Sequence, residues 1–421
     1  MKNREFFKGK KVVVVGLARS GVASGILLKE LGAEVCITDI ADSETLRKNK
    51  LELEAKGISQ IELGRHSEDF VRGRDLMVIS PGVDTGSQAV TWAKKFGIQI
   101  INEVELSFMV CPAKVIAITG TNGKTTVTTL IGKIIQAAGQ NAVICGNIGN
   151  PFAAEVSRLK EGDLVSLEVS SFQLETIKTF KPYICVFLNF TPDHLDRYRD
   201  VNEYLAAKKR IYMNQDRNDY AVLNNADPVL KGLSKEIKAN VRYFDAGSGL
   251  DPNQSAALEV AKILKIDKDI CLEVFHNFKG IEHRMEWVLE LSGVEFINDS
   301  KATNVDSTAW ALNSINKPVI LIAGGKDKGI DYSLVSRLVR QKVKALILLG
   351  EAKDKIKSAL GNIVPCVETV SMQQAVESAF KKAHPGECVL LSPMCASFDM
   401  FQNYEERGRI FKKAVLDLAK N

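Results

Sequence analysis

The segment GTNGKTT, residues 120–126, carries the strongest chemical signal in the sequence. It lies between two apolar runs, which predicts a glycine turn joining a buried strand to a helix. Backbone N–H groups at a helix N-terminus bind phosphate oxygens, Lys124 supplies a charge near the β- and γ-phosphates, and the Thr125 hydroxyl is suited to Mg²⁺. Ile118 stands where the common P-loop has its first glycine, so this loop is a shortened variant, and a structural turn with a solvated lysine is the alternative. We predict a nucleotide phosphate site formed by Gly120, Thr121, Asn122, Gly123, Lys124, Thr125 and Thr126.

Two polar sites follow further apolar runs. Glu168 ends the run in LVSLEV, while Asp193 and His194 come shortly after YICVFLNF, a strand expected to end near Phe190. The carboxyl ends of parallel strands meet at the ligand crevice of an α/β sheet, and Mg²⁺ needs oxygen ligands beyond the phosphates. An outward-facing Glu168 and a surface His194 are the alternatives. Together with the phosphate loop, these residues favour a metal site.

The elements that carry these residues repeat a short β-branched strand, a glycine and a helix. Most strand candidates are continuously apolar, which is typical of parallel strands covered on both faces. We therefore predict an α/β, doubly wound protein with three domains. These are a Rossmann-like N-terminal domain (residues 1–104), a central P-loop ATP-binding domain with a parallel sheet (105–280) and a C-terminal Rossmann-like α/β domain (281–421). The segment RMEWVLELSGVEFIND is expected to form a hairpin that turns at Ser292 and Gly293.

Composition excludes several classes of protein. The net charge of +5 over 421 residues is small, and no stretch concentrates Lys and Arg as a nucleic-acid protein would. The eight cysteines form no CxxC pair, which fits a reducing compartment better than a disulfide frame or a zinc site. No run reaches the roughly 18 apolar residues of a membrane helix, and the N-terminus has no signal core. We expect a cytoplasmic monomer with no membrane span and no nucleic-acid partner.

The N-terminal segment VGLARSGVASG invites a second interpretation, a nicotinamide-dependent dehydrogenase. The dinucleotide fingerprint needs a glycine where this chain has Ala18, although Asp39 matches its acidic residue. This alternative also leaves Lys124 without a role. A catalytically silent nucleotide-binding scaffold is the third hypothesis, and the full set of candidate metal and phosphate groups argues against it.

Several motifs together resemble a known family. GTNGKTT, the glutamate of LEVSSFQLE, NFTPDHLDRY and AAKKRIY are similar to segments of the Mur ligases and of the related folylpolyglutamate synthase. GIEHRMEW, FINDSKATN, GGKDKG and SPMCASFDMFQNYEERG look like the Mur ligases that add D-glutamate. The resemblance covers essentially the whole chain. It implies ATP-dependent joining of D-glutamate to UDP-N-acetylmuramoyl-L-alanine through an acyl phosphate, in peptidoglycan synthesis; another Mur-type or folylpolyglutamate-type ligase is the alternative.

The resemblance also implies roles for single residues. Catalytic roles would fall to Lys124, His194, Lys208 and Lys301. Two Mg²⁺ ions are expected, with Thr125, Glu168, His194 and a carbamylated Lys208 as ligands. Lys209, the neighbour of Lys208, is the competing position for this modification, and unmodified, solvated lysines are the alternative for both.

Three groups of substrate contacts follow from the same resemblance. Asn253, Arg284, Asp299 and Lys301 would contact ATP or the transferring phosphoryl group from the C-terminal side, so that Lys301 acts only on domain closure. The segment SGLDPNQS departs from the family pattern, which puts adenine contacts near Leu250 and Asp251 in doubt. The UDP-substrate would be bound by Arg19, Ser20, Asp39, Ser80, Pro81, Gly82, Asn147 and His194. D-Glutamate would be bound by Thr303, Lys328, Ser397, Phe398 and Tyr404.

Overall fold

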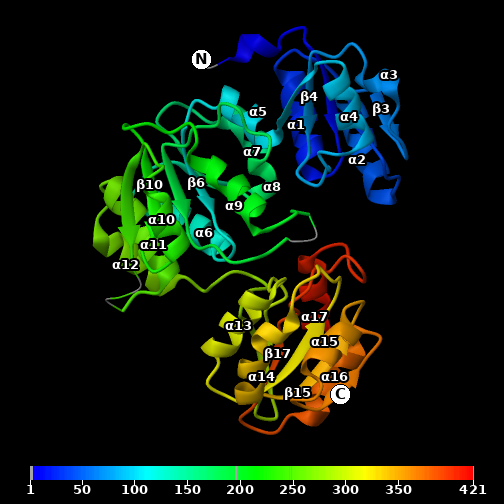
Figure 1. The fold of residues 1–421 in the computed structure, drawn as a ribbon, viewed down its shortest axis with the longest axis vertical. Helices are drawn as coiled ribbons and strands as arrows, with labels where there is room; N and C mark the ends of the chain where they lie inside the picture. Colours follow the sequence, from blue (N-terminus) through cyan, green and yellow to red (C-terminus); the bar gives the residue numbers. More distant parts are fainter. Residues whose placement is uncertain (1–2, 195–196, 246, 248, 421) are drawn as a thin grey trace. The chain divides into compact units, whose positions relative to one another are not determined.

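The structure is a computed structural model that describes residues 3–194, 197–245, 247 and 249–420 (Figure 1). The chain forms two compact units, one of Met1–Phe190 with Tyr204–Phe278 and the other of Thr191–Glu203 with Lys279–Asn421. The first unit holds two sheets and the second holds one. The prediction of a three-domain α/β protein with parallel sheets is confirmed. The domain boundaries at residues 104 and 280 stay predictions.

The N-terminal sheet is parallel, with strand order β3-β2-β1-β4-β5. The chain reverses direction across the sheet between β1 and β4, where the carboxyl ends of an open α/β sheet form a crevice. Val12–Val15 of β1 are fully buried, because helices cover both faces. The elements are η1 (Arg4–Phe7), β1 (Lys11–Val15), α1 (Arg19–Glu30), β2 (Glu34–Asp39), α2 (Glu44–Ala55), β3 (Gln60–Leu63), α3 (Glu68–Val71), β4 (Leu76–Ile79), α4 (Gln88–Lys95), β5 (Gln99–Asn102) and α5 (Glu103–Val110).

The central sheet is also parallel, with order β11-β10-β9-β6-β8-β7, and its reversal lies between β6 and β9. Helices α6, α11 and α12 pack on one face, where Ile116 and Ile118 of β6 meet Val127 and Ile131 of α6. Its elements are β6 (Lys114–Thr119), α6 (Lys124–Ala137), β7 (Ala142–Gly146), α7 (Phe152–Glu155), η2 (Val156–Arg158), β8 (Leu164–Glu168), α8 (Ser171–Leu174), β9 (Ile184–Phe187), α9 (Val201–Lys209), η3 (Arg210–Tyr212), β10 (Tyr220–Asn224), α10 (Pro228–Leu233), β11 (Asn240–Phe244), α11 (Pro252–Ile263) and α12 (Lys268–Asn277).

The C-terminal sheet has order β12-β13-β17-β14-β15-β16, and β12 is its one antiparallel member among the described strands. Strand β14 shows why its sequence is continuously apolar: Val319, Leu321 and Ala323 enter the core under α13, α14 and α15. Ile320 and Ile322 enter the opposite core, under α16 and α17. The elements are β12 (Glu286–Leu291), β13 (Val294–Asn298), α13 (Val305–Ser314), β14 (Val319–Gly324), η4 (Tyr332–Val335), α14 (Ser336–Lys342), β15 (Val343–Leu349), α15 (Lys353–Leu360), β16 (Cys366–Glu368), α16 (Met372–Lys382), β17 (Cys388–Leu391) and α17 (Tyr404–Leu418).

Local expectations agree with the structure except at element ends. The hairpin between β12 and β13 is confirmed, and both turn residues, Ser292 and Gly293, have positive φ, as a tight two-residue turn requires. Strand β9 ends at Phe187 rather than near Phe190, because the next residues leave the ladder to contact the loop after β6. All eight cysteines are free and seven are buried. Within the part of the chain that is described, no helix is both long and apolar enough to cross a bilayer.

Candidate active site

The loop after β6 has the geometry of an anion-binding turn. Gly120 and Gly123 have φ angles of 153° and 83°, and Gly123 is the N-cap of α6, so the first N–H groups of that helix open into the loop. Asn189, which follows β9, fixes the loop from the side. Its carboxamide accepts from the Asn122 N–H at 2.8 Å and donates to the Asn122 carbonyl at 3.1 Å. The loop therefore lies at the sheet's reversal point, between β6 and β9.

Two lysines converge on this loop. Lys124 Nζ donates to the carbonyls of Gly120 and Thr121, each at 2.8 Å. Lys208 Nζ, on α9, also donates to the Gly120 carbonyl at 2.8 Å, although its side chain is 1 % exposed. The two ammonium groups therefore share one acceptor, the Gly120 carbonyl oxygen. Lys209 instead points to Glu236, with which it forms an ion pair, so Lys208 is the lysine that the structure brings to the loop.

Glu168 ends β8, next to β6 and β7, and is 1 % exposed. Its Oε1 accepts from the Asn147 Nδ2 at 2.8 Å, whereas its buried Oε2 has no hydrogen-bond partner within the described structure. A buried carboxylate oxygen without a partner is costly and is usually compensated by a cation. The donor set at this edge of the sheet, Glu168 with the buried Thr125, therefore fits a hard oxygen-seeking ion such as Mg²⁺.

Asn253 was expected to contact ATP from the C-terminal side, but the structure places it in the first unit. It lies on α11 of the first unit, with its Oδ1 2.5 Å from where a Cβ on Gly123 would be. Asp251, whose adenine contact was in doubt, is the N-cap of α11 and accepts from the N–H groups of Asn253 and Gln254. Leu250 is half-buried against the core under α11. Asp251 and Leu250 therefore hold the helix that brings Asn253 to the loop.

In the second unit, Asp299, Lys301 and Arg284 meet at the carboxyl end of β13. Asp299 is 4 % exposed, and burial raises its pKa to about 7, against the opposing effect of the Arg284 guanidinium and of hydrogen bonds from the Ser392 hydroxyl and the Met285 N–H. Lys301 Nζ donates to the Tyr404 hydroxyl at 3.2 Å and lies 5.0 Å from the centroid of its ring. The Arg284 guanidinium lies 5.9 Å from the Trp310 ring.

A second polar group gathers around Lys328, which follows β14. Its Nζ lies 3.7 Å from Asp193 Oδ1, and Asp193 Oδ2 accepts from Asn304 Nδ2 at 2.9 Å. Burial disfavours the charge on Asp193, but Lys328, His194 and Asn304 together hold its pKa below the ordinary value. His194 is half-buried beside Asp193 and has a φ of 57°. Lys328 is thus paired with the Asp193 carboxylate within the second unit.

The remaining residues predicted to hold D-glutamate differ in burial. Ser397 is buried after β17 and its carbonyl accepts from the N–H groups of Met400 and Phe401. Thr303 is half-buried in the turn after Lys301, while Phe398 is 72 % exposed. All three follow strands β13 and β17, which are neighbours in the sheet.

The residues predicted to hold the UDP group share the carboxyl edge of the N-terminal sheet, apart from Asn147 and His194, and His194 belongs to the second unit. Gly16, after β1, is contacted by the Ser80 hydroxyl at 3.2 Å, and the Asp39 carboxylate accepts from the Leu17 N–H at 2.7 Å. Arg19 is exposed and Ser20 half-buried at the start of α1, with Pro81 and Gly82 following Ser80. Asn147 follows β7 of the central sheet, where its Nδ2 donates to Glu168.

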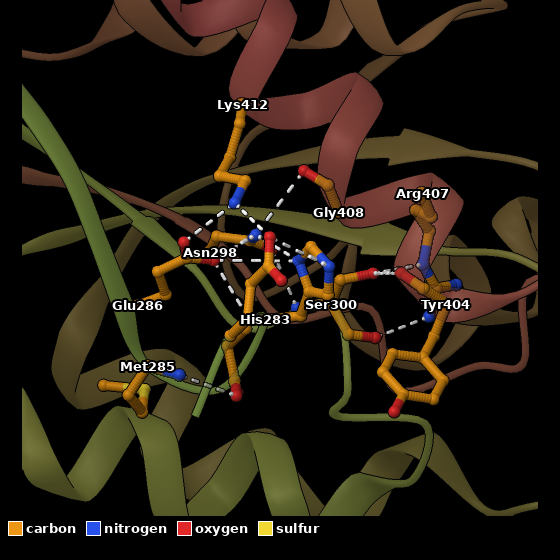
Figure 2. A network of polar contacts seen from close by, with 11 residues as sticks. His283, Met285, Glu286, Asn298, Ser300, Tyr404, Arg407, Gly408 and Lys412 are labelled. Atoms are coloured by element: carbon orange, nitrogen blue, oxygen red, sulfur yellow. Dashed lines mark hydrogen bonds and ion pairs between the residues drawn. The ribbon is translucent and has the colours of Figure 1, made fainter. Parts of the chain in front are cut away.

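Sequence reasoning missed two residues. Asn189 fixes the loop after β6 through two hydrogen bonds to Asn122, and an Asn so close to the end of a buried strand could have indicated it. Arg407, on α17, is 1 % exposed and donates to the Ser300 hydroxyl and carbonyl (Figure 2). It also donates to the carbonyls of Cys395 and Ala396. The sequence holds no comparable signal for Arg407, because an Arg on an amphipathic helix ordinarily faces solvent.

Comparison with protein families gives matches along most of the chain. Residues 10–102 match the family model described as the Mur ligase MurD-like N-terminal domain. Residues 118–293 match the Mur ligase middle domain, and residues 283–395 match the glutamate ligase domain of Mur ligases.

Curated relatives and solved structures agree with these matches. The UDP-N-acetylmuramoylalanine–D-glutamate ligase of Thermoanaerobacter pseudethanolicus is 39% identical, over 98% of this chain and 99% of its own. That of Caldicellulosiruptor bescii is 41% identical over 98% of each. In fold, the chain is similar to the UDP-N-acetylmuramate-alanine ligase of Thermotoga maritima (TM-score 0.64, 16% identity, 97% and 100% covered) and to the MurF ligase of the same organism in complex with ADP (0.61, 16%, 100% and 98%). The chain therefore belongs to the Mur ligase family.

Proposed function

We propose that this chain is an ATP-dependent ligase that joins D-glutamate to UDP-N-acetylmuramoyl-L-alanine in peptidoglycan synthesis. The observation that carries the proposal is the whole-length similarity, 39% to 41% identity, to curated relatives with that activity in their names. The phosphate loop, the unpaired Glu168 oxygen and the carboxylate-binding Lys328 each supply a group that this chemistry needs. The alternative, another Mur-type or folylpolyglutamate-type ligase, would use the same first step with a different acid or amine.

The reaction needs an activated carboxyl group, because a carboxylate has no good leaving group for an amine to displace. The substrate carboxylate attacks the γ-phosphorus of ATP, which forms an acyl phosphate and releases ADP. The D-glutamate amine then attacks the acyl carbon, loses a proton and expels phosphate. In such chemistry the protein mainly positions the reactants and neutralises charge.

Residues of the first unit would serve the phosphoryl transfer. The N–H groups after Gly120 and the Lys124 ammonium would bind the phosphates, and Asn253 would contact the nucleotide from α11. Thr125, Glu168 and a carbamylated Lys208 of this unit would hold Mg²⁺, which would neutralise the charge of the phosphate oxygens. The family resemblance adds His194, a residue of the second unit, as a further ligand. Carbamylation of Lys208 is supported by its position, since it would remove one of two cations that share the Gly120 carbonyl and replace it with an anion.

Residues of the second unit would serve both the phosphoryl transfer and the binding of the acceptor. Arg284, Asp299 and Lys301 would act on the nucleotide and the transferring phosphoryl group. Lys328, Thr303, Ser397, Phe398 and Tyr404 would bind D-glutamate, and the edge of the N-terminal sheet would bind the uridine diphosphate. Binding this remote group orients the reacting carboxylate without contacting it.

The test is the dependence of ATP turnover on each substrate. ADP and phosphate should appear only when UDP-N-acetylmuramoyl-L-alanine and D-glutamate are both present, with a product whose mass shows one added glutamate. L-Glutamate, L-alanine, L-lysine and meso-diaminopimelate serve as acceptor controls, and dihydropteroate as the acid of the folylpolyglutamate alternative. ATP turnover that ignores the omission of either substrate would refute the proposal.

A further inference from the structure

Arg407 is a buried cation with an unusual set of partners. Its side chain is 1 % exposed, and within the described structure each of its four hydrogen bonds ends on a neutral oxygen. Burial lowers its pKa to about 10, so the group stays protonated near neutral pH. Removing a guanidinium from water costs several kcal/mol unless its donors are satisfied, and an apolar side chain would often stabilise a core equally well. Stability alone therefore does not explain why an arginine is buried at this position.

The four hydrogen bonds join two separate segments. Nε and Nη2 donate to the hydroxyl and carbonyl of Ser300, at 3.0 and 2.8 Å. Nη1 donates to the carbonyls of Cys395 and Ala396, both at 3.1 Å. Ser300 lies between Asp299 and Lys301, on the phosphoryl side of the proposed site. Cys395 and Ala396 immediately precede Ser397, on the D-glutamate side.

Each segment also has its own anchor that does not involve Arg407. The Ser300 N–H donates to Asn298 Oδ1 at 3.2 Å, and the Ser300 hydroxyl donates to the Tyr404 carbonyl at 2.8 Å. Ala396 is held by the Lys326 N–H, which donates to its carbonyl at 2.9 Å. Other hydrogen bonds join neighbouring residues of the two segments: the Met394 N–H donates to the Ala302 carbonyl at 3.0 Å, and the Ser392 hydroxyl donates to Asp299 at 2.9 Å. Loss of Arg407 would therefore leave each segment its local shape and remove the four hydrogen bonds that fix Ser300 against Cys395 and Ala396.

The helix that carries Arg407 is itself fixed (Figure 2). Gly408 contacts His283 so closely that a Cβ there would lie 2.3 Å from His283 Nδ1. Lys412, farther along α17, donates to Glu282 and Glu286, at 2.6 and 2.9 Å. The planar guanidinium of Arg407, carried by this fixed helix, therefore holds Ser300 at a defined distance from Cys395 and Ala396, which the flexible ammonium group of a lysine could not do.

We propose that Arg407 is a positioning residue for the second chemical step: it fixes the segment of Lys301 against the segment of Ser397, and so aligns the acyl phosphate with the incoming amine. This inference rests on the proposed function. It assigns Arg407 no contact with substrate.

The experiment compares Arg407→Lys and Ser300→Ala with wild type in the full-length protein. Ser300→Ala is the milder change and removes the hydroxyl that Nε contacts. Arg407→Lys should lower kcat by about 100-fold and Ser300→Ala by about 5-fold, because misplacement of the order of 1 Å has such effects. In Arg407→Lys, KM for ATP and for D-glutamate should each stay within about threefold, since each segment keeps its own anchors. Isotope exchange between the bridging and non-bridging oxygens of ATP, which reports the first step alone, should remain near the wild-type rate.

Lys412→Met is the control for general loosening of α17, because it removes two ion pairs on the same helix, with Glu282 and Glu286, and these pairs involve neither Ser300 nor Cys395 and Ala396. It should lower the melting temperature without lowering kcat. Equal losses of kcat in Lys412→Met and Arg407→Lys, or a wild-type kcat in Arg407→Lys, would overturn the positioning role alone. A wild-type protein that forms no glutamyl product would instead overturn the proposed function, and this inference with it.

Discussion

Gly123→Ala tests whether the phosphate loop and α11 form one site. Gly123 has a φ of 83°, and an added Cβ would lie 2.5 Å from Asn253 Oδ1 and 3.3 Å from Leu188 Cδ1. Ordinary van der Waals contact begins at 3.4 Å, so the loop and Asn253 must separate by about 0.9 Å. The substitution therefore displaces two groups that we propose contact the same nucleotide.

The magnitude has two parts. A left-handed φ costs a non-glycine residue about 1–2 kcal/mol wherever it occurs, which lowers stability but not the activity of folded protein. Displacement of a substrate-positioning group by about 1 Å costs of the order of 100-fold in rate, or about 2.7 kcal/mol of transition-state stabilisation. We expect Gly123→Ala to lower kcat/KM for ATP by about 100-fold, with KM for D-glutamate within about threefold of wild type.

Gly139→Ala is the matched control. Gly139 has a φ of 75°, close to that of Gly123, but no atom lies within 4 Å of its added Cβ. Both variants should lose similar stability in urea titrations, and only Gly123→Ala should lose activity. Asn253→Gly in the Gly123→Ala background removes the clashing oxygen and should not lower activity further. If Gly123→Ala retained the kcat/KM of Gly139→Ala, the loop would not bind the nucleotide as we propose.

Three further predictions concern polar groups of the site. Glu168→Gln should raise the Mg²⁺ concentration for half-maximal activity by about 10-fold or more without lowering the melting temperature of metal-free protein, because it removes a buried, unpaired carboxylate oxygen; a metal requirement equal to wild type would refute this. Asp299→Asn should flatten the pH dependence of stability. Burial raises the pKa of Asp299 in the folded protein from 3.8 to about 7, so its contribution to the free energy of unfolding is full below pH 3.8 and is lost as pH rises through 7. The loss should reach up to about 4 kcal/mol when unfolding is followed by urea titration at each pH. Parallel pH curves for wild type and variant would contradict this prediction. Asn189→Ala, which loses both hydrogen bonds to Asn122, should raise KM for ATP roughly 10-fold and leave KM for D-glutamate unchanged.

The fold was predictable because its signals are local and repeated. Continuous apolar runs such as Val319–Gly324 are explained by β14, whose side chains enter two cores in alternation. Strand ends were less predictable, since contacts with other segments decide them. The end of β9 at Phe187 depends on Asn189, whose partners lie 67 residues earlier in the chain.

Residues that contact the phosphate loop from distant parts of the sequence cannot be predicted from the motif of the loop itself. GTNGKTT indicates an anion site by its own sequence, whereas Lys208 reaches the Gly120 carbonyl from 88 residues away. The family resemblance favoured Lys208 over Lys209, and the two side chains leave α9 in different directions. Lys208 points into the core and its neighbour points to Glu236.

The NDSKATN segment shows what a sequence alone cannot reveal. Without the family resemblance, it is typical of an ordinary polar turn after a strand. In the structure Asn298, Asp299, Ser300 and Asn304 are all at most 5 % exposed, a concentration of buried polar side chains that no turn needs. Burial of polar groups is tolerated only where partners satisfy them, and here the partners are Arg407, Ser392 and Asp193 from distant parts of the chain. These partners hold the segment in a fixed conformation before any substrate binds. Such preorganisation is what a site needs if its polar groups are to stabilise the charge that develops during phosphoryl transfer.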